Sequence, residues 1–225
     1  GSLVLDVFGF VKVEGDFGIE SRKGQVKLAG IANDPKTTKD ETQVDVDMLL
    51  IGGSKLKAFA GAGDIGIELK DVELGLALLT EQVAKPAAGQ TAPEARNWTT
   101  VQATVGQAAF VGVDGLTVEV KNMGLSVNRM ASDTSVVDYS LTAATDDAAT
   151  ARHTELSVAT GPSRDLALTL DGAAGQMTRL VGSLRLDVFG FVKVEGDFGI
   201  ESRQGKVKLA GIENDPKTTK DETQV

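Results

Sequence analysis

The chain has 225 residues, of which 41% are hydrophobic and only 4% aromatic, and its formal net charge is -9. It contains no cysteine, which excludes disulfide bonds, cysteine nucleophiles and thiolate metal sites. Surfaces that bind nucleic acid are rich in lysine and arginine, so the acidic balance argues against nucleic acid as a partner. No apolar run approaches the roughly 18 residues of a membrane helix, and we expect no membrane-spanning segment.

The beginning of the chain returns at its end. Residues 1–44 align without a gap with residues 182–225, at an offset of 181. We therefore expect a piece of a longer tandem array: 1–44 a partial copy of a repeated β-hairpin segment, 45–181 the remainder of one unit, and 182–225 the start of the next copy. The four differences between the copies are Val4/Arg185, Lys23/Gln204, Gln25/Lys206 and Ala32/Glu213.

Residues 184–200 alternate between apolar and mainly polar side chains. This period of two predicts a half-buried strand of about three times the usual length, unless a bulge or bend at Gly190 or Gly196 divides it. The following segment, SRQG at 202–205, and its counterpart SRKG at 21–24 predict the turn of a long hairpin.

A weaker repeat lies inside the unit, where residues 58–79 align with residues 109–130 at an offset of 51. In both segments the apolar phase shifts by one residue, at Lys70-Asp71 and at Lys121-Asn122. Such a shift indicates a bulge inside a long strand or a tight turn between two short strands. We predict an all-β fold with long antiparallel strands and hairpins, in an elongated sandwich or a solenoid-like repeat module.

Catalytic motifs are missing from the sequence, and we expect no enzyme. The only histidine, His153, lies in a polar stretch and is interpreted as a surface residue. The aromatic residues Trp98 and Tyr139 could mark a sugar subsite, but each lies in or near an apolar alternation, which favours packing in a core or an interface.

Calcium is the one cofactor that the sequence leaves open. The polar loop NDPKTTKDET occurs in both copies and combines carboxylate and amide oxygens, which calcium prefers, with two lysines that oppose a cation. The candidate ligands are Asn33, Asp34, Asp40 and Glu41 in the first copy, and Asn214, Asp215, Asp221 and Glu222 in the second.

The long period, the near-identical copies, the lack of cysteine and the acidic, alternating strands resemble the tandem extender repeats of giant bacterial surface proteins, including adhesins exported by type 1 secretion. The resemblance implies a structural spacer at the cell surface or outside the cell, whose partners are neighbouring copies of the same unit. The period is longer than that of the familiar extender sandwiches, and no site motif of the family is matched.

Two other functions remain open at this point. The unit could be an adhesive module that binds carbohydrate or depends on calcium, or an elongated β structure that carries lipid or another apolar ligand. Strand edges that stay unpaired would also allow copies of the chain to associate with one another.

Overall fold

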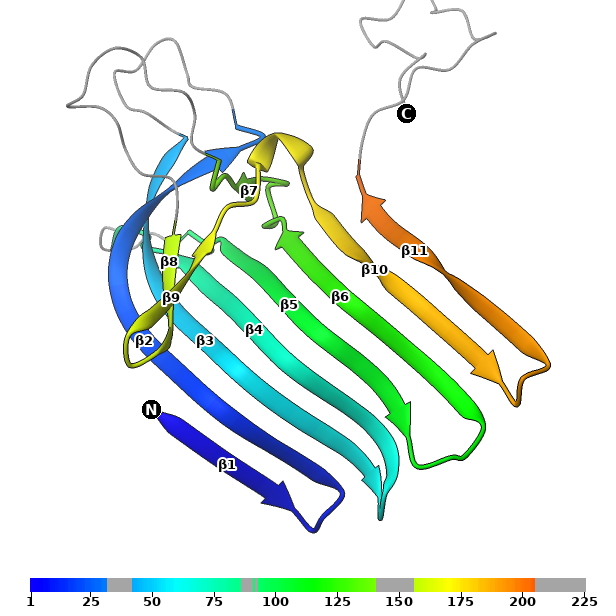
Figure 1. The fold of residues 1–225 in the computed structure, drawn as a ribbon. Coiled ribbons are helices and arrows are strands. Elements are labelled where there is room, and N and C mark those ends of the chain that lie inside the picture. Colours follow the sequence, from blue (N-terminus) through cyan, green and yellow to red (C-terminus); the bar gives the residue numbers. More distant parts are fainter. Residues whose placement is uncertain (32–41, 86–90, 92, 141–155, 205–225) are drawn as a thin grey trace, which may run out of the picture.

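A computed structural model describes residues 1–31, 42–85, 91, 93–140 and 156–204. These residues form strands and one short 3-10 helix, so the predicted all-β class with long antiparallel strands is confirmed. Most of the strands belong to one large antiparallel sheet (Figure 1). Whether the unit forms part of a sandwich or a solenoid stays a prediction.

The long strands follow one another in the sheet as they do in the chain. Their order is β1 (Ser2–Val7), β2 (Val11–Ala29), β3 (Gln43–Ala62), β4 (Ile65–Glu81), β5 (Asn97–Val111), β6 (Leu116–Arg129), β10 (Met177–Val188) and β11 (Val192–Arg203). Between β6 and β10 the chain first forms β7 (Val136–Val137), which pairs with β2 at Leu28 and Ala29. It then forms the separate hairpin of β8 (Leu156–Gly161) and β9 (Arg164–Leu168), and the 3-10 helix η1 (Gly172–Ala174). It then returns to the next position beside β6.

The hairpins of the repeated segment turn at Phe8-Gly9 and at Phe189-Gly190, inside the region where the sequence predicted a single strand. Phe8 and Gly9 have φ values of 52° and 73°, and the amide of Phe10 donates to the carbonyl of Val7 at 3.0 Å, as in a tight hairpin turn. The last paired residues, Val7 and Val11, enclose three residues. Because this number is odd, the alternation keeps its phase through the turn, and two strands look like one.

The turn predicted at 21–24 is wrong, because β2 runs through these residues and stays paired with β3. Arg22 lies opposite Met48 and Gly24 opposite Val46. Gly24 serves packing, since a Cβ there would lie 2.6 Å from the terminal methyl of Met48. The single long strand predicted at 184–200 is also wrong, because this segment is divided between β10 and β11, which have 12 residues each. Strands of such length do occur in the sheet, since β2 has 19 residues and β3 has 20.

A row of irregularities crosses the sheet near the middle of its strands. Lys55, Asp71 and Asn122 have left-handed φ values of 53°, 53° and 49°, and the pairing of β3 with β2 and β4 shifts register near Lys55. The interpretation of the phase shifts at Lys70-Asp71 and Lys121-Asn122 as bulges is therefore confirmed, and the alternative of tight turns is wrong. We call the part of the sheet between this row and the four hairpin turns the tip half, and the remainder the covered half.

The covered half supports the main core. The hairpin β8–β9 packs across β2, β3 and β4 on one face of the sheet (Figure 1). Glycines on β2 and β3 allow its backbone to come close: a Cβ at Gly18 or Gly52 would lie 2.2 Å from the carbonyl oxygen of Ala159. The main buried cluster includes residues of the sheet and of the hairpin: Val26, Leu28, Val46, Met48, Leu50, Ala77, Leu79, Trp98, Ala131, Val137, Tyr139, Leu156, Val158 and Leu168.

Candidate functional site

The most extensive functional candidate is the sheet face opposite the hairpin β8–β9, which we call the apolar face. Residues directly opposite on paired strands share a face, so the register identifies its members. One row crosses eight strands without a polar side chain: Val7, Val11, Ala60, Ile67, Phe110, Val118, Leu186 and Val194. The next row consists of Leu5, Val13, Ala58, Leu69, Ala108, Val120, Leu184 and Gly196.

The bulges keep this face apolar past the middle of the strands. In β4 the residues of the apolar face are odd-numbered before Asp71, ending at Leu69, and even-numbered after it, beginning with Val72. Leu69 nevertheless packs on the same cluster as Val72 and Leu74. The extra residue in the bulge turns the even-numbered side chains after Asp71 to the same face as the odd-numbered side chains before it. The apolar face therefore continues from the tip half into the covered half.

Many side chains of the apolar face remain open to solvent. Ile19 is 74% exposed, Ile67 54% and Ile200 63%. No other element among the described residues packs on this face, since β7 and β8–β9 lie on the opposite one. Its exposed large side chains are Leu3, Leu5, Val7, Val11, Ile19, Leu49, Ile65, Ile67, Leu78, Val192, Val194 and Ile200.

The face is most buried at the bulge row. Leu56, Val72 and Val105 are only 5–8% exposed, although only strands of the same sheet cover them among the described residues. Their neighbours are Phe17, Leu69, Leu74, Ala108 and Met123. These side chains form a second apolar cluster that interlocks across the bulges.

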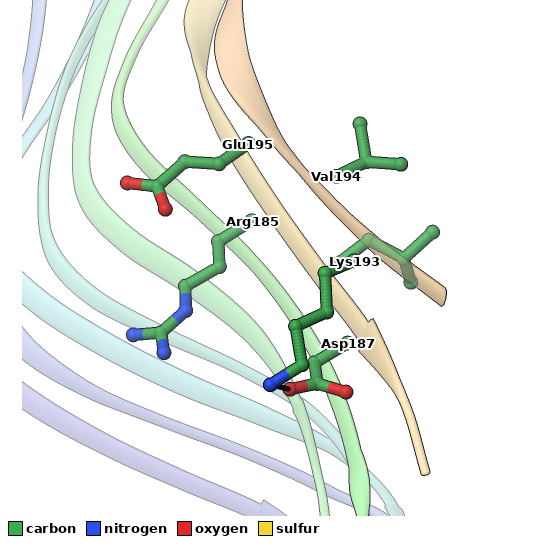
Figure 2. Close-up of a pocket in the computed structure, with 6 residues that line it drawn as sticks. Arg185, Asp187, Lys193, Val194 and Glu195 are labelled. Carbon is green, nitrogen blue, oxygen red and sulfur yellow. Dashed lines mark ion pairs between the residues drawn. The ribbon is translucent and has the colours of Figure 1, made fainter. Parts of the chain in front are cut away.

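The opposite face of the tip half is charged. Figure 2 shows Arg185, Asp187, Lys193 and Glu195 on one side of β10 and β11, with Val194 directed to the other. Lys193 Nζ lies 3.2 Å from Asp187 Oδ2. The Gly190 amide, and then Lys193, hold the pKa of Asp187 below its usual range. Further ion pairs on this face join Lys57 to Glu14, Lys70 to Glu68 and Lys121 to Glu119, so both signs of charge are interspersed.

Arg96 organises the far end of the covered half. It forms a two-point ion pair with Glu81, at 2.7 and 2.8 Å, and contacts Asp133 at 2.8 Å. Its guanidinium also lies 5.2 Å from the centre of the Trp98 ring. The hydrogen bond from Arg96 lowers the pKa of Glu81, while burial opposes the change. For Asp133, burial acts to raise the pKa, but hydrogen bonds from Ser135 and Arg96 outweigh it and the pKa is lowered.

Trp98 and Tyr139 belong to the core, as the sequence favoured, and each is 1% exposed. Trp98 Nε1 donates to the carbonyl and the hydroxyl oxygen of Ser135, both at 3.1 Å. The Tyr139 hydroxyl donates to Thr100 Oγ1 at 2.9 Å, and burial raises the pKa of Tyr139. Neither ring is presented to a sugar.

His153 lies outside the described residues. So do all eight calcium candidates: Asn33, Asp34, Asp40 and Glu41 in the first loop, and Asn214, Asp215, Asp221 and Glu222 in the second. In the part of the chain that the structure describes, no group of three or more histidine, aspartate or glutamate side chains is placed to hold a metal ion. The calcium prediction is therefore untested.

Comparison with protein-family models, with curated proteins and with solved structures gives no significant match. Within the described residues, no helix has the length and the apolar character that a membrane crossing requires.

Sequence reasoning assigned no residues to the apolar face. The signal was present in the phase shifts at Asp71 and Asn122, which keep one face apolar across a bulge. The missing fact was the position of β8–β9, because strand alternation does not reveal which face another element covers.

Proposed function

We propose that the chain is a structural repeat unit, in which one antiparallel sheet continues from each unit into the next and serves as a spacer. The carrying observation is that both copies of the repeated segment form the same hairpin. Ser2 pairs with Asp16 in the first copy and Ser183 with Asp197 in the second, and every other pair of β1 with β2 has its counterpart in β10 and β11.

The position of the two hairpins supports this proposal. They form the two ends of the sheet order, so the second copy stands where the next unit would begin. In β11, residues 192–203 repeat residues 11–22 of β2 without a difference. The free edge of β11 therefore presents the side chains that β2 presents to β3, and the β3 of a following unit would find its usual partner there.

Each unit would contribute six long strands, β1 to β6, to the continuing sheet. At about 4.8 Å between neighbouring strands, the sheet would advance by roughly 29 Å per unit. Reach of this kind is what a surface-bound or secreted extender needs, and the resemblance to giant bacterial adhesins fits it. The location at the cell surface or outside the cell is part of the proposal.

Small-angle scattering tests the proposal on chains lengthened by one and by two periods. We expect the maximum dimension to grow by about 30 Å per added period. An equimolar mixture of separate units of the same sequence serves as the control for the covalent connection. Units that behave as beads on a flexible string, or that collapse into a compact particle, would contradict the continuous sheet.

A second function is favoured by the apolar face: transport or storage of an apolar ligand along the sheet. Its two rows in the tip half run across all eight strands and contain aliphatic and phenylalanine side chains, without side-chain hydrogen-bonding groups that would orient a polar ligand. A contiguous exposed apolar surface marks an interaction site in a soluble domain.

Native mass spectrometry and a fluorescent fatty-acid displacement assay test this second function. Phe110 and Ala109 are neighbours on β5 that point to opposite faces. We expect Phe110→Lys to abolish binding of the fatty acid and Ala109→Lys to leave it unchanged. Equal affinity in the two variants would show that the apolar face is not the binding surface.

A further inference from the structure

The two outermost strands of the sheet have a free edge. Among the described residues, β1 pairs only with β2 and β11 only with β10. A free edge presents unpaired N–H and C=O groups to any strand that approaches. Apolar side chains are exposed along both edges: Leu3, Leu5 and Val7 on β1 (41–49%), and Val192, Val194 and Ile200 on β11 (49–63%).

The equivalent strand of the second copy, β10, has a neighbouring strand on the side where β1 has none. Leu184 and Leu186 repeat Leu3 and Leu5, but they are half-buried. The difference follows from β6, which places Val120 opposite Leu184 and Val118 opposite Leu186. A neighbouring strand is thus sufficient to cover these side chains.

We propose that the two edges, where no neighbouring unit of the same chain occupies them, complete each other between molecules: β1 of a second copy pairs antiparallel with the free edge of β11. Because β11 repeats the sequence of β2, the incoming β1 meets the residue types it already pairs with inside its own chain. Val7 would lie opposite Val192, Leu5 opposite Val194 and Asp6 opposite Lys193. These matches repeat the pairs of Val7 with Val11, Leu5 with Val13 and Asp6 with Lys12.

The two faces of the sheet agree across this joint. Leu5 and Val7 of the second copy and Val194 of the first all belong to the apolar face, so that face continues over the boundary. On the charged face, Lys193 would lie between Asp187 of its own chain and Asp6 of the second copy. Opposite charges on neighbouring strands stabilise such a pairing.

Pairing of β11 with itself is less favourable. An antiparallel β11 pair centred on residues 196 to 199 places acidic side chains directly opposite each other in every register that keeps the apolar faces together. A pair centred on residue 196 places Glu195 opposite Asp197 of the other copy, and one centred on 197 places the two Asp197 residues opposite each other. A pair centred on 198 places Glu195 opposite Glu201, and one centred on 199 places Asp197 opposite Glu201. Like charges directly opposite destabilise a strand pair. The strand β1 brings only Asp6.

The joint is head-to-tail, so each added copy presents a new free β11. Heterologous contacts of this kind give open chains of molecules rather than closed dimers. The partner is therefore a second copy of this chain, and the association extends the sheet in the strand-stacking direction.

Sedimentation velocity over a range of concentrations tests the association. We expect the wild-type chain to form a ladder of oligomers, and Leu5→Lys, which places a charge on the apolar side of the edge, to weaken association by about tenfold or more. The matched control is Val4→Arg, which adds the same charge on the other face. It reproduces the residue found at position 185 and places it opposite Glu195, so association should persist or tighten. A wild-type chain that stays monomeric, or equal weakening by both variants, would overturn the proposal.

Disulfide trapping tests the pairing itself in this cysteine-free chain. A chain carrying Leu5→Cys and Val194→Cys can close that pair only between molecules, because the two positions lie on opposite edges of the sheet. We expect oxidation to give a ladder of covalent oligomers. A chain with Leu5→Cys and Val13→Cys carries the corresponding match inside one molecule and should stay monomeric when oxidised.

The single variants separate the alternatives. Covalent dimers formed as efficiently by Val194→Cys alone would show that β11 pairs with itself. Efficient dimers of Leu5→Cys alone would show the same for β1. Either result, or an associating protein in which the double variant does not trap, contradicts the pairing of β1 with β11.

Discussion

The two copies of the repeated hairpin, β1–β2 and β10–β11, differ in their neighbours and agree in their own structure. The Gly9 amide donates to Asp6 Oδ1 at 2.7 Å, and the Gly190 amide donates to Asp187 Oδ1 at 2.9 Å. Burial differs: Val194 is 49% exposed, while the equivalent residue Val13 is half-buried beside β3. Local sequence thus determines the turn and the register, and neighbouring strands determine how much surface the hairpin buries.

The largest expected contrast between the copies concerns Gly18 and Gly199, which are equivalent residues. A Cβ at Gly18 would lie 2.2 Å from the carbonyl oxygen of Ala159, whereas the nearest atom to a Cβ at Gly199 is a Val181 methyl at 3.7 Å. We expect Gly18→Ala to lower the free energy of unfolding by about 2–3 kcal/mol, because β8 must move away from the sheet. Gly199→Ala should change it by less than about 0.5 kcal/mol.

Urea denaturation of the two variants measures this difference. Similar losses in both copies would mean that β8–β9 does not rest on the glycines of β2 and β3.

A smaller contrast should appear at the apolar residues of β1 and β10. Leu184 packs between β6 and β11, while its equivalent Leu3 has a neighbouring strand on one side and is 49% exposed. Leu184→Ala should cost about 1–2 kcal/mol of stability, and Leu3→Ala about half of that or less. Thermal unfolding of the two variants at one low concentration gives the comparison without contributions from association. An equal cost would contradict the account of the free edge.

Substitutions in the two hairpin turns should cost the same stability in both copies, because the turns depend on local sequence and not on neighbouring strands. Gly9 and Gly190 have left-handed φ values of 73° and 75°, and neither has an atom within 4 Å of a Cβ position. Alanine is strained at such φ values for local reasons alone. We expect Gly9→Ala and Gly190→Ala each to cost about 1 kcal/mol, measured by chemical denaturation. Unequal costs would show that neighbours, and not only local sequence, control the turn.

The smallest expected effect is a pH dependence at Arg96, in a part of the sheet without a second copy. The pKa values of Glu81 and Asp133 are lowered from their ordinary values of 4.5 and 3.8. Their contribution to stability is therefore complete above those values and is lost as the pH falls through the lowered ones. Arg96→Met should reduce the loss of stability between pH 6 and pH 3 by less than about 1 kcal/mol, because the ion pairs are partly exposed. Melting curves of both proteins across this range check it, and parallel curves would count against the assignment.

Much of the strand structure could be predicted from the sequence, because alternation is a local property. The same locality explains the errors. Alternation kept its phase through Phe8 and Gly9, so a hairpin was taken for one strand, and Gly24 was assigned to a turn although it makes room for Met48. The bulge at Asp71 was visible as a phase shift. The apolar face was not identified, because its exposure depends on β8–β9 packing on the opposite face, a contact between residues far apart in sequence.

The bulges in β3 to β6 also determine which length changes these strands can accept. Deleting Asp71 would restore regular alternation in β4, so the side chains on one side of the deletion would change faces. Leu69 and Ile67 would then turn toward the charges, and Glu68 toward the hydrocarbon surface. Inserting two residues would shift the register and keep every side chain on its face. Variation in the length of these strands should therefore proceed in even steps, with odd steps confined to the loops.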